Sequence, residues 1–326
     1  MQPWYPRCPP RFGLVAPVRA GLPGGPTSDQ VRGPGWRQVS HGLYVPSDTE
    51  ERPEQRIVEA AARLPATGMV TGWAALRLAR AAWFDGAGRG VPVLLPHASR
   101  IRALGPEVVR TRRRLPTPIE LYGVRCAPPP DALAHELRRE PDLRERVVML
   151  DMALLARVVT MEQVRALPEA AARGATAYAT GQCRSAPEVR MSMVWQLDAG
   201  CAPPLMNREV LDQQGRLVAV VDLLDTQTPT YGEYDGEMHR TRSRHRRDTE
   251  RAEALRSIGL ESFTVVAGDS RTVRVRRMIA ARDRAAYASV PRRWRVGRHV
   301  PMRQLAPDLT TEEVEGLAGW GTNPGS

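Results

Sequence analysis

The order of segments between residues 187 and 285 constrains the fold more than any other feature of the chain. A helical pattern at 187–199 is followed by strand-like runs at 209–212, 217–224 and 231–234, a helix at 243–258, a strand at 261–266 and a helix at 270–285. Strands and helices that alternate in this way form a sheet covered by helices. The order therefore predicts a layered α/β domain in the C-terminal third of the chain.

Two carboxylates close neighbouring strands of this predicted sheet. Asp222 ends the apolar run 217–221, and Glu233 ends the next strand, just before the turn dipeptide Asp235-Gly236. Carboxylates at the ends of adjacent strands can converge on one hard cation, which clamps a phosphodiester and activates water. Glu188 lies at the start of the preceding helix and supplies a third carboxylate. Asp235 is also simply a turn residue.

These motifs occur in a recognisable order. Ser-Ala-Pro-Glu at 185–188, Val-Asp-Leu at 221–223 and Gly-Glu-Tyr-Asp-Gly at 232–236, followed by the helix from Arg246, resemble the restriction-endonuclease-like PD-(D/E)XK superfamily. Within it they are most similar to the actinobacterial branch related to very short patch repair endonucleases. The resemblance covers about residues 183–285 and implies an α/β/α endonuclease-like domain.

The resemblance implies roles for individual residues. Asp222 and Glu233 would bind Mg²⁺ or Mn²⁺ together with the backbone carbonyl of Tyr234, and Glu188 would be an accessory carboxylate. Asp235 replaces the superfamily lysine, as in close relatives, and the chain contains no lysine. His239 is a candidate general base because imidazole titrates near neutral pH, although an ordinary loop histidine is the alternative.

All basic side chains of the chain are arginine or histidine. The chain carries 47 Lys and Arg against 36 Asp and Glu, a formal net charge of +11. Arginine binds phosphate with its planar fork, so polyanions are the leading class of partner, although arginine usage also follows genomic base composition. A run next to the carboxylates is suited to the DNA backbone, with a solvated, salt-paired helix face as the alternative. It consists of Arg240, Arg242, Arg244, Arg246 and Arg247.

The N-terminal half resembles a second family. The segments 36–46, 72–76 and 150–154 are similar to AbiEi-type antitoxins and regulators of type IV toxin–antitoxin systems. That family implies an N-terminal winged helix-turn-helix that binds DNA, a following regulatory domain and a cognate toxin as partner. The hairpin at 36–46 would be the wing, and the helices that should precede it fall in the Pro- and Gly-rich stretch 1–35.

We expect four regions in the chain. They are a Pro/Gly-rich start with the wing-like hairpin (1–50), a mixed α/β regulatory region (51–180), the endonuclease-like domain (181–290) and a tail (291–326). In the second region the patterns predict helices at 53–64, 70–82, 131–139 and 142–159, strands at 91–95, 108–110 and 119–125, and a capping box at 160–163.

A cytoplasmic location is expected. Residues 1–10 contain four prolines and no continuous apolar core, unlike a secretory signal. The most apolar helical stretch, 147–159, is too short for a bilayer and contains Asp151 and Arg157.

Two hypotheses of function follow. The first is a DNA endonuclease that depends on a divalent metal. The second is a non-enzymatic AbiEi-type antitoxin or transcriptional regulator with a degenerate nuclease fold, which the missing lysine favours.

Overall fold

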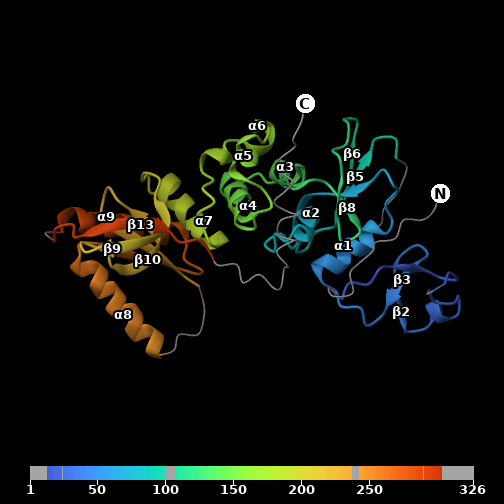
Figure 1. Ribbon diagram of the computed structural model, residues 1–326, viewed down its shortest axis with the longest axis horizontal. Helices are drawn as coiled ribbons and strands as arrows, with labels where there is room; N and C mark the ends of the chain where they lie inside the picture. The colour runs from blue at the N-terminus through green and yellow to red at the C-terminus, as the bar shows by residue number, and fades with distance from the viewer. Residues whose placement is uncertain (1–12, 24, 100–106, 237–241, 289, 303–326) are drawn as a thin grey trace. The chain divides into compact units, whose positions relative to one another are not determined.

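The computed structural model describes residues 13–23, 25–99, 107–236, 242–288 and 290–302, with the backbone alone at 242–248. The chain divides into two compact units, Met1–Thr176 and Ala177–Ser326, and the division falls inside the Ala-, Gly- and Thr-rich segment 170–182. Each unit combines sheets with helices (Figure 1), which confirms the mixed α/β class.

The first unit begins with a small antiparallel sheet. Strands β2 (Trp36–Ser40) and β3 (Leu43–Pro46) form the predicted hairpin, and β1 (Val18–Arg19) pairs with the other edge of β3. The described residues before β2 contain a short 3-10 helix, Gln30–Arg32, but no α-helix. The helices that a winged helix requires before its wing are therefore not among the described residues.

The second sheet of this unit is mixed. Its strand order is β6-β5-β4-β8-β7, in which β5 and β6 are parallel and β4 and β8 are parallel. The strands are β4 (Met69–Val70), β5 (Pro92–Pro96), β6 (Glu107–Thr111), β7 (Ile119–Leu121) and β8 (Val124–Cys126). The helices are α1 (Pro53–Ala61), α2 (Gly72–Leu78), α3 (Pro129–Arg139), α4 (Leu143–Leu155), α5 (Met161–Arg165) and α6 (Glu169–Ala172). The capping box of Thr160 and Gln163 is present as predicted.

Two of the predicted elements in this unit were wrong in detail. The predicted strand at 119–125 is a hairpin, because Tyr122 and Gly123 both adopt positive φ angles (52° and 71°) and turn the chain back on itself. The predicted helix at 70–82 begins only at Gly72, because Met69–Val70 is drawn into the sheet between β5 and β8.

The second unit contains one five-stranded sheet with the order β12-β11-β10-β9-β13. Its elements are α7 (Ala186–Met193), a π-helical turn (Val194–Asp198), β9 (Leu205–Asp212), β10 (Leu217–Asp225), β11 (Thr230–Asp235), α8 (Arg242–Ser257), β12 (Glu261–Val266), α9 (Arg271–Tyr287) and β13 (Trp294–His299). Strands β9, β10 and β11 form an antiparallel meander, and α8 connects β11 to the parallel strand β12. The predicted order of helices and strands up to 285 is confirmed.

Strand β13 lies in the segment that we had assigned to a tail. It pairs antiparallel with the edge of β9, so the sheet continues to residue 299. Only Trp294 and Val296 alternate as apolar residues, and the arginines around them mask the strand pattern. Charged side chains are typical of an edge strand.

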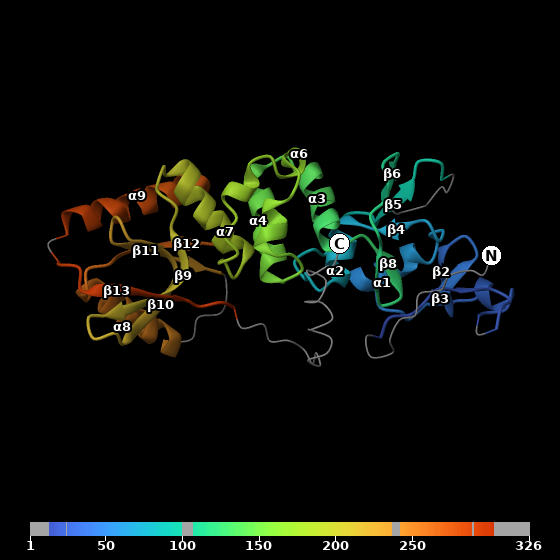
Figure 2. The ribbon, with the colours of Figure 1, turned by 45° about the horizontal axis from the view of Figure 1, so that its top comes forward.

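Helices cover both faces of this sheet. Figure 2 shows α8 on one side and α7 and α9 on the other. Val221 packs with Leu255 of α8 in the core of one face, whereas Trp195 of the π-helical turn stacks on Phe263 of β12. In the described part of the chain, no helix is both long and apolar enough to cross a membrane.

Candidate functional site

Asp222 and Glu233 are opposite one another on adjacent strands. Leu223 of β10 pairs with Gly232 of β11, so the next position of this antiparallel ladder places Asp222 across from Glu233. Side chains at directly opposite positions lie on the same face, with Cβ atoms about 5 Å apart. The Oδ2 atom of Asp222 also accepts a hydrogen bond of 2.9 Å from the backbone N–H of Tyr234. The structure therefore brings the two principal predicted residues together.

The surroundings of both carboxylates disfavour their ionisation. Burial, followed by the charge of Asp222, raises the pKa of Glu233 from 4.5 to about 8. Burial also raises the pKa of Asp222, Glu188 raises it further, and the N–H of Tyr234 opposes both. Desolvation and like charges both favour the neutral acid, so Glu233 holds its proton more tightly than an exposed glutamate does.

Glu188 is near these carboxylates, but its own oxygens already have donors. Its Oε1 accepts from the Ser185 hydroxyl (2.9 Å), and its Oε2 accepts from the Arg184 backbone N–H (2.8 Å) and the Asn207 amide (2.7 Å). Ser185 is also the N-cap of α7 and accepts from the Glu188 N–H. Glu188 therefore fixes the start of α7 against β9 and adds negative charge to the site.

Arg251 is the site residue that sequence reasoning missed. It lies on α8 and donates to Oε1 of Glu233 at 2.7 Å and to the backbone carbonyl of Val220. Its charge lowers the pKa of both Glu233 and Asp222. The sequence placed Arg251 among the charged residues of a helix and carried no signal that it reaches across to the sheet.

The other predicted residues are only partly described. Asp235 ends β11, and its carbonyl accepts from the Ala267 N–H at 3.2 Å. His239 and Arg240 lie outside the described residues. The remaining arginines of the predicted run occupy the first turns of α8, and their side chains also lie outside what the structure describes: Arg242, Arg244, Arg246 and Arg247.

The donors at the site suit a magnesium ion better than a metal that requires an all-protein cage. Among the described residues, no three side chains of His, Cys, Asp or Glu are arranged to hold a metal ion. Mg²⁺ usually keeps several waters and takes one or two carboxylates together with substrate phosphate. Asp222, Glu233 and the Tyr234 carbonyl would supply oxygen donors of that kind.

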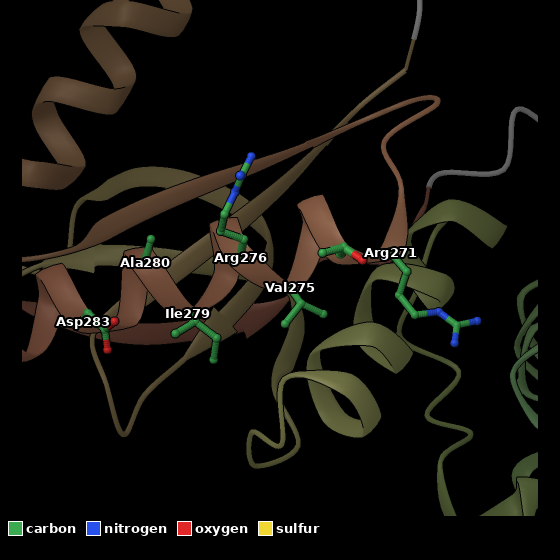
Figure 3. A pocket seen from close by; sticks show the side chains of 7 residues that line it. Arg271, Val275, Arg276, Ile279, Ala280 and Asp283 are labelled. Carbon is green, nitrogen blue, oxygen red and sulfur yellow. The ribbon is translucent and has the colours of Figure 1, made fainter.

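A separate hollow of about 560 Å³ runs along the outer side of α9. Figure 3 shows Val275 and Ile279 on one side of the helix, with Arg276 directed away from them. Asp283 lies at one end and Arg271 at the other, and none of the predicted site residues lines this hollow. It is therefore distinct from the carboxylate pair.

No known protein family, curated protein or solved structure matches the chain. The candidate site consequently depends on its own geometry and charge.

Proposed function

We propose that the second unit is a phosphodiester hydrolase that depends on a divalent cation and acts on DNA. The observation that carries this proposal is the juxtaposition of Asp222 and Glu233, with the pKa of Glu233 raised to about 8. Two half-buried carboxylates that face each other disfavour ionisation, and a bound cation would favour it. An α/β/α sandwich with carboxylates on its second and third strands is also the architecture that the endonuclease resemblance implies.

The residues of this chain would share the chemistry as follows. Asp222, Glu233 and the Tyr234 carbonyl would hold Mg²⁺ or Mn²⁺, which supplies charge stabilisation to a phosphodiester and lowers the pKa of water. Glu188 holds α7 in place and keeps the site strongly negative, which favours a divalent over a monovalent cation.

Arg251 is our candidate for the electrostatic role of the absent lysine. One nitrogen of its guanidinium, Nη2, donates both to Glu233 at 2.7 Å and to the Val220 carbonyl. In this position it can donate to a phosphate oxygen and stabilise negative charge that develops during hydrolysis. Arginine keeps its proton, so it cannot act as the general base, and His239 is our candidate for that step.

The arginine run would bind the DNA backbone beside the site. Arg242, Arg244, Arg246 and Arg247 enter α8, the helix that delivers Arg251. Arginine contacts with phosphates release counterions, so affinity falls with salt at a log–log slope of about −0.9 per duplex phosphate neutralised. Replacing Arg244, Arg246 and Arg247 by alanine should flatten this slope, and an unchanged slope would assign the run to a solvated helix face.

A cleavage assay tests the function directly. Full-length protein is incubated with duplex, mismatched and single-stranded DNA in Mg²⁺, Mn²⁺ or chelator. We expect cleavage that requires metal and is abolished by Glu233→Gln. The matched control is Glu209→Gln, since Glu209 lies on the same sheet and also pairs with an arginine, Arg298, at 2.9 Å. Loss of cleavage in both variants, or none in the wild type, would reject the proposed reaction.

One observation favours the alternative of a non-enzymatic regulator. Arg251 already gives Glu233 a positive partner, and no third acidic, His or Cys side chain joins the pair among the described residues. In that case the fold would serve as a DNA-binding or interaction module, with a cognate toxin as partner. DNA binding of equal strength with and without metal, and no cleavage of any substrate, would support this function.

A further inference from the structure

A second hollow lies in the first unit, away from every predicted site residue. Its volume is about 720 Å³, and its lining includes residues 96–98 and 111–116, which are the last residues of strands β5 and β6 of the second sheet and the segments that follow them. Strands β5 and β6 are parallel and end side by side, because Pro96 pairs with Thr111. The segments that follow them therefore begin together, and the His97 N–H donates to the Thr111 carbonyl at 2.9 Å. Such an edge is where sheets with parallel strands commonly bind ligands.

Four arginines line this hollow, which we call the basic cleft. Arg112, Arg113 and Arg114 follow β6, and Arg125 comes from β8. The Arg113 N–H donates to the Thr111 hydroxyl at 3.0 Å, which fixes where the run leaves the strand. No Asp or Glu is among the described residues that line the cleft. A cleft lined by one sign of charge concentrates counterions.

Several arginines elsewhere in the same unit have acidic partners. Glu59 pairs with Arg37 at 2.8 Å, Glu54 with Arg77 at 2.6 Å and Glu136 with Arg89 at 2.5 Å.

The four cleft arginines differ from these. Within the described part of the chain they have no ion pair, and the Nε atom of Arg125 is buried without a hydrogen-bond partner. Guanidinium groups without an acidic partner are suited to bind an anion from outside the unit.

We infer that the basic cleft binds the phosphate backbone of a nucleic-acid strand. Nucleic acid carries one negative charge per phosphate at short, regular intervals, a charge density that suits four guanidinium groups in one cleft. The rest of the lining is largely Ala, Pro, Leu, Met and Thr, and it contains no Phe, Tyr or Trp on which bases could stack. Binding is therefore to phosphates and independent of base sequence. This inference does not require that the carboxylate site be active.

The test compares two triple variants that change net charge equally. The first variant removes the three exposed positive charges of the cleft by combining Arg112→Gln, Arg113→Gln and Arg114→Gln. The control replaces Arg138, Arg157 and Arg165, which are exposed elsewhere in the same unit, by Gln. Full-length proteins are titrated into a fluorescent DNA duplex of about 20 base pairs in chelator, between about 50 and 300 mM salt, and thermal melts check folding. Chelator removes any contribution of metal-dependent cleavage.

We expect the cleft variant to weaken DNA binding by about tenfold or more at low salt. Its log–log salt slope should be shallower by up to about 2.7, which corresponds to three phosphates, whereas the control keeps nearly the wild-type slope. Arg125→Gln should weaken binding in the same direction. Equal slopes for the two triple variants would overturn the inference. Polyglutamate that displaces DNA at equal charge concentration would also overturn it and would assign the cleft to an acidic protein.

Discussion

Each unit contains a carboxylate next to an arginine, yet the two pairs differ in their surroundings. In the first unit Glu136 contacts Arg89, with Nη1–Oε2 at 2.5 Å and Nη2–Oε1 at 3.3 Å. In the second unit Glu233 contacts Arg251 at 2.7 Å. The difference lies in the charges around each pair.

The pair in the first unit is balanced. Arg89 and Arg139 both contact Glu107, so two arginines face two glutamates. Glu136 is 1% exposed, and a Cβ atom at Gly72, which has a φ of 56°, would lie 2.3 Å from its Oε1. The chain therefore uses glycine to make room for this carboxylate. We conclude that Glu136 has a structural role.

The pair in the second unit is unbalanced. Glu188, Asp222 and Glu233 interact through their charges. Among the arginine side chains that the structure describes, Arg251 donates to a carboxylate of the group, whereas the Arg184 guanidinium donates to the Val300 carbonyl. A balanced pair stabilises a fold, whereas an excess of buried negative charge indicates a place for a cation.

The largest expected effect is on stability. Glu136→Gln removes the closer of the two carboxylates that contact Arg89 and leaves it with Glu107 at 3.4 Å, and we expect the first unit to lose about 3 kcal/mol. Glu233→Gln removes an anion from a group with excess negative charge, so we expect no loss in the second unit at pH 8. Calorimetric unfolding of both variants measures the two effects, and comparable losses would mean that both pairs are structural.

The sequence predicted some residues of the carboxylate site and missed others. Asp222 and Glu233 could be found because each interrupts an apolar strand pattern, but the expectation that they end their strands was wrong, because β10 continues to Asp225 and β11 to Asp235. Arg251 and Asn207 could not be found from the sequence. The role of Arg251 depends on how α8 packs on the sheet, and the role of Asn207 depends on its left-handed backbone (φ 49°) within β9. Likewise, the order of helices and strands up to 285 followed from the pattern, but edge strand β13 has too few apolar residues to be recognised.

The next effect concerns metal affinity. If Asp222 and Glu233 share a divalent ion, Asp222→Asn and Glu233→Gln should each weaken Mn²⁺ binding by tenfold or more, about 1.4 kcal/mol. Glu136→Gln should leave the affinity unchanged, because its carboxylate belongs to the balanced pair. Isothermal titration calorimetry measures all three. Wild-type affinity in both site variants would remove the carboxylate pair as a metal site.

A smaller effect is expected in the pH dependence of stability. The pKa of Glu233 is about 8 in the folded protein, against an ordinary value of 4.5. Between these values the unfolded chain has released a proton that the folded unit retains, so the stability of the second unit should fall as pH rises through this window. Glu233→Gln should reduce the fall by more than about 1 kcal/mol, or about 2–4 °C in Tm. Identical pH profiles for wild type and variant in metal-free buffer would mean that Glu233 ionises normally.

The smallest effect separates the two roles open to Arg251. Its guanidinium and a metal ion compete for Glu233, so Arg251→Gln should raise Mn²⁺ affinity a few-fold while it lowers the cleavage rate, because a donor to phosphate is lost. Arg251→Lys keeps the charge but not the planar guanidinium, whose Nη2 atom contacts both Glu233 and the Val220 carbonyl, and it should restore only part of the rate. A purely structural arginine would instead lower metal affinity and rate together, because Glu233 would lose its position. Opposite signs for affinity and rate in Arg251→Gln would therefore mark the guanidinium as part of the reaction, and equal signs would return Arg251 to the same structural class as Arg89.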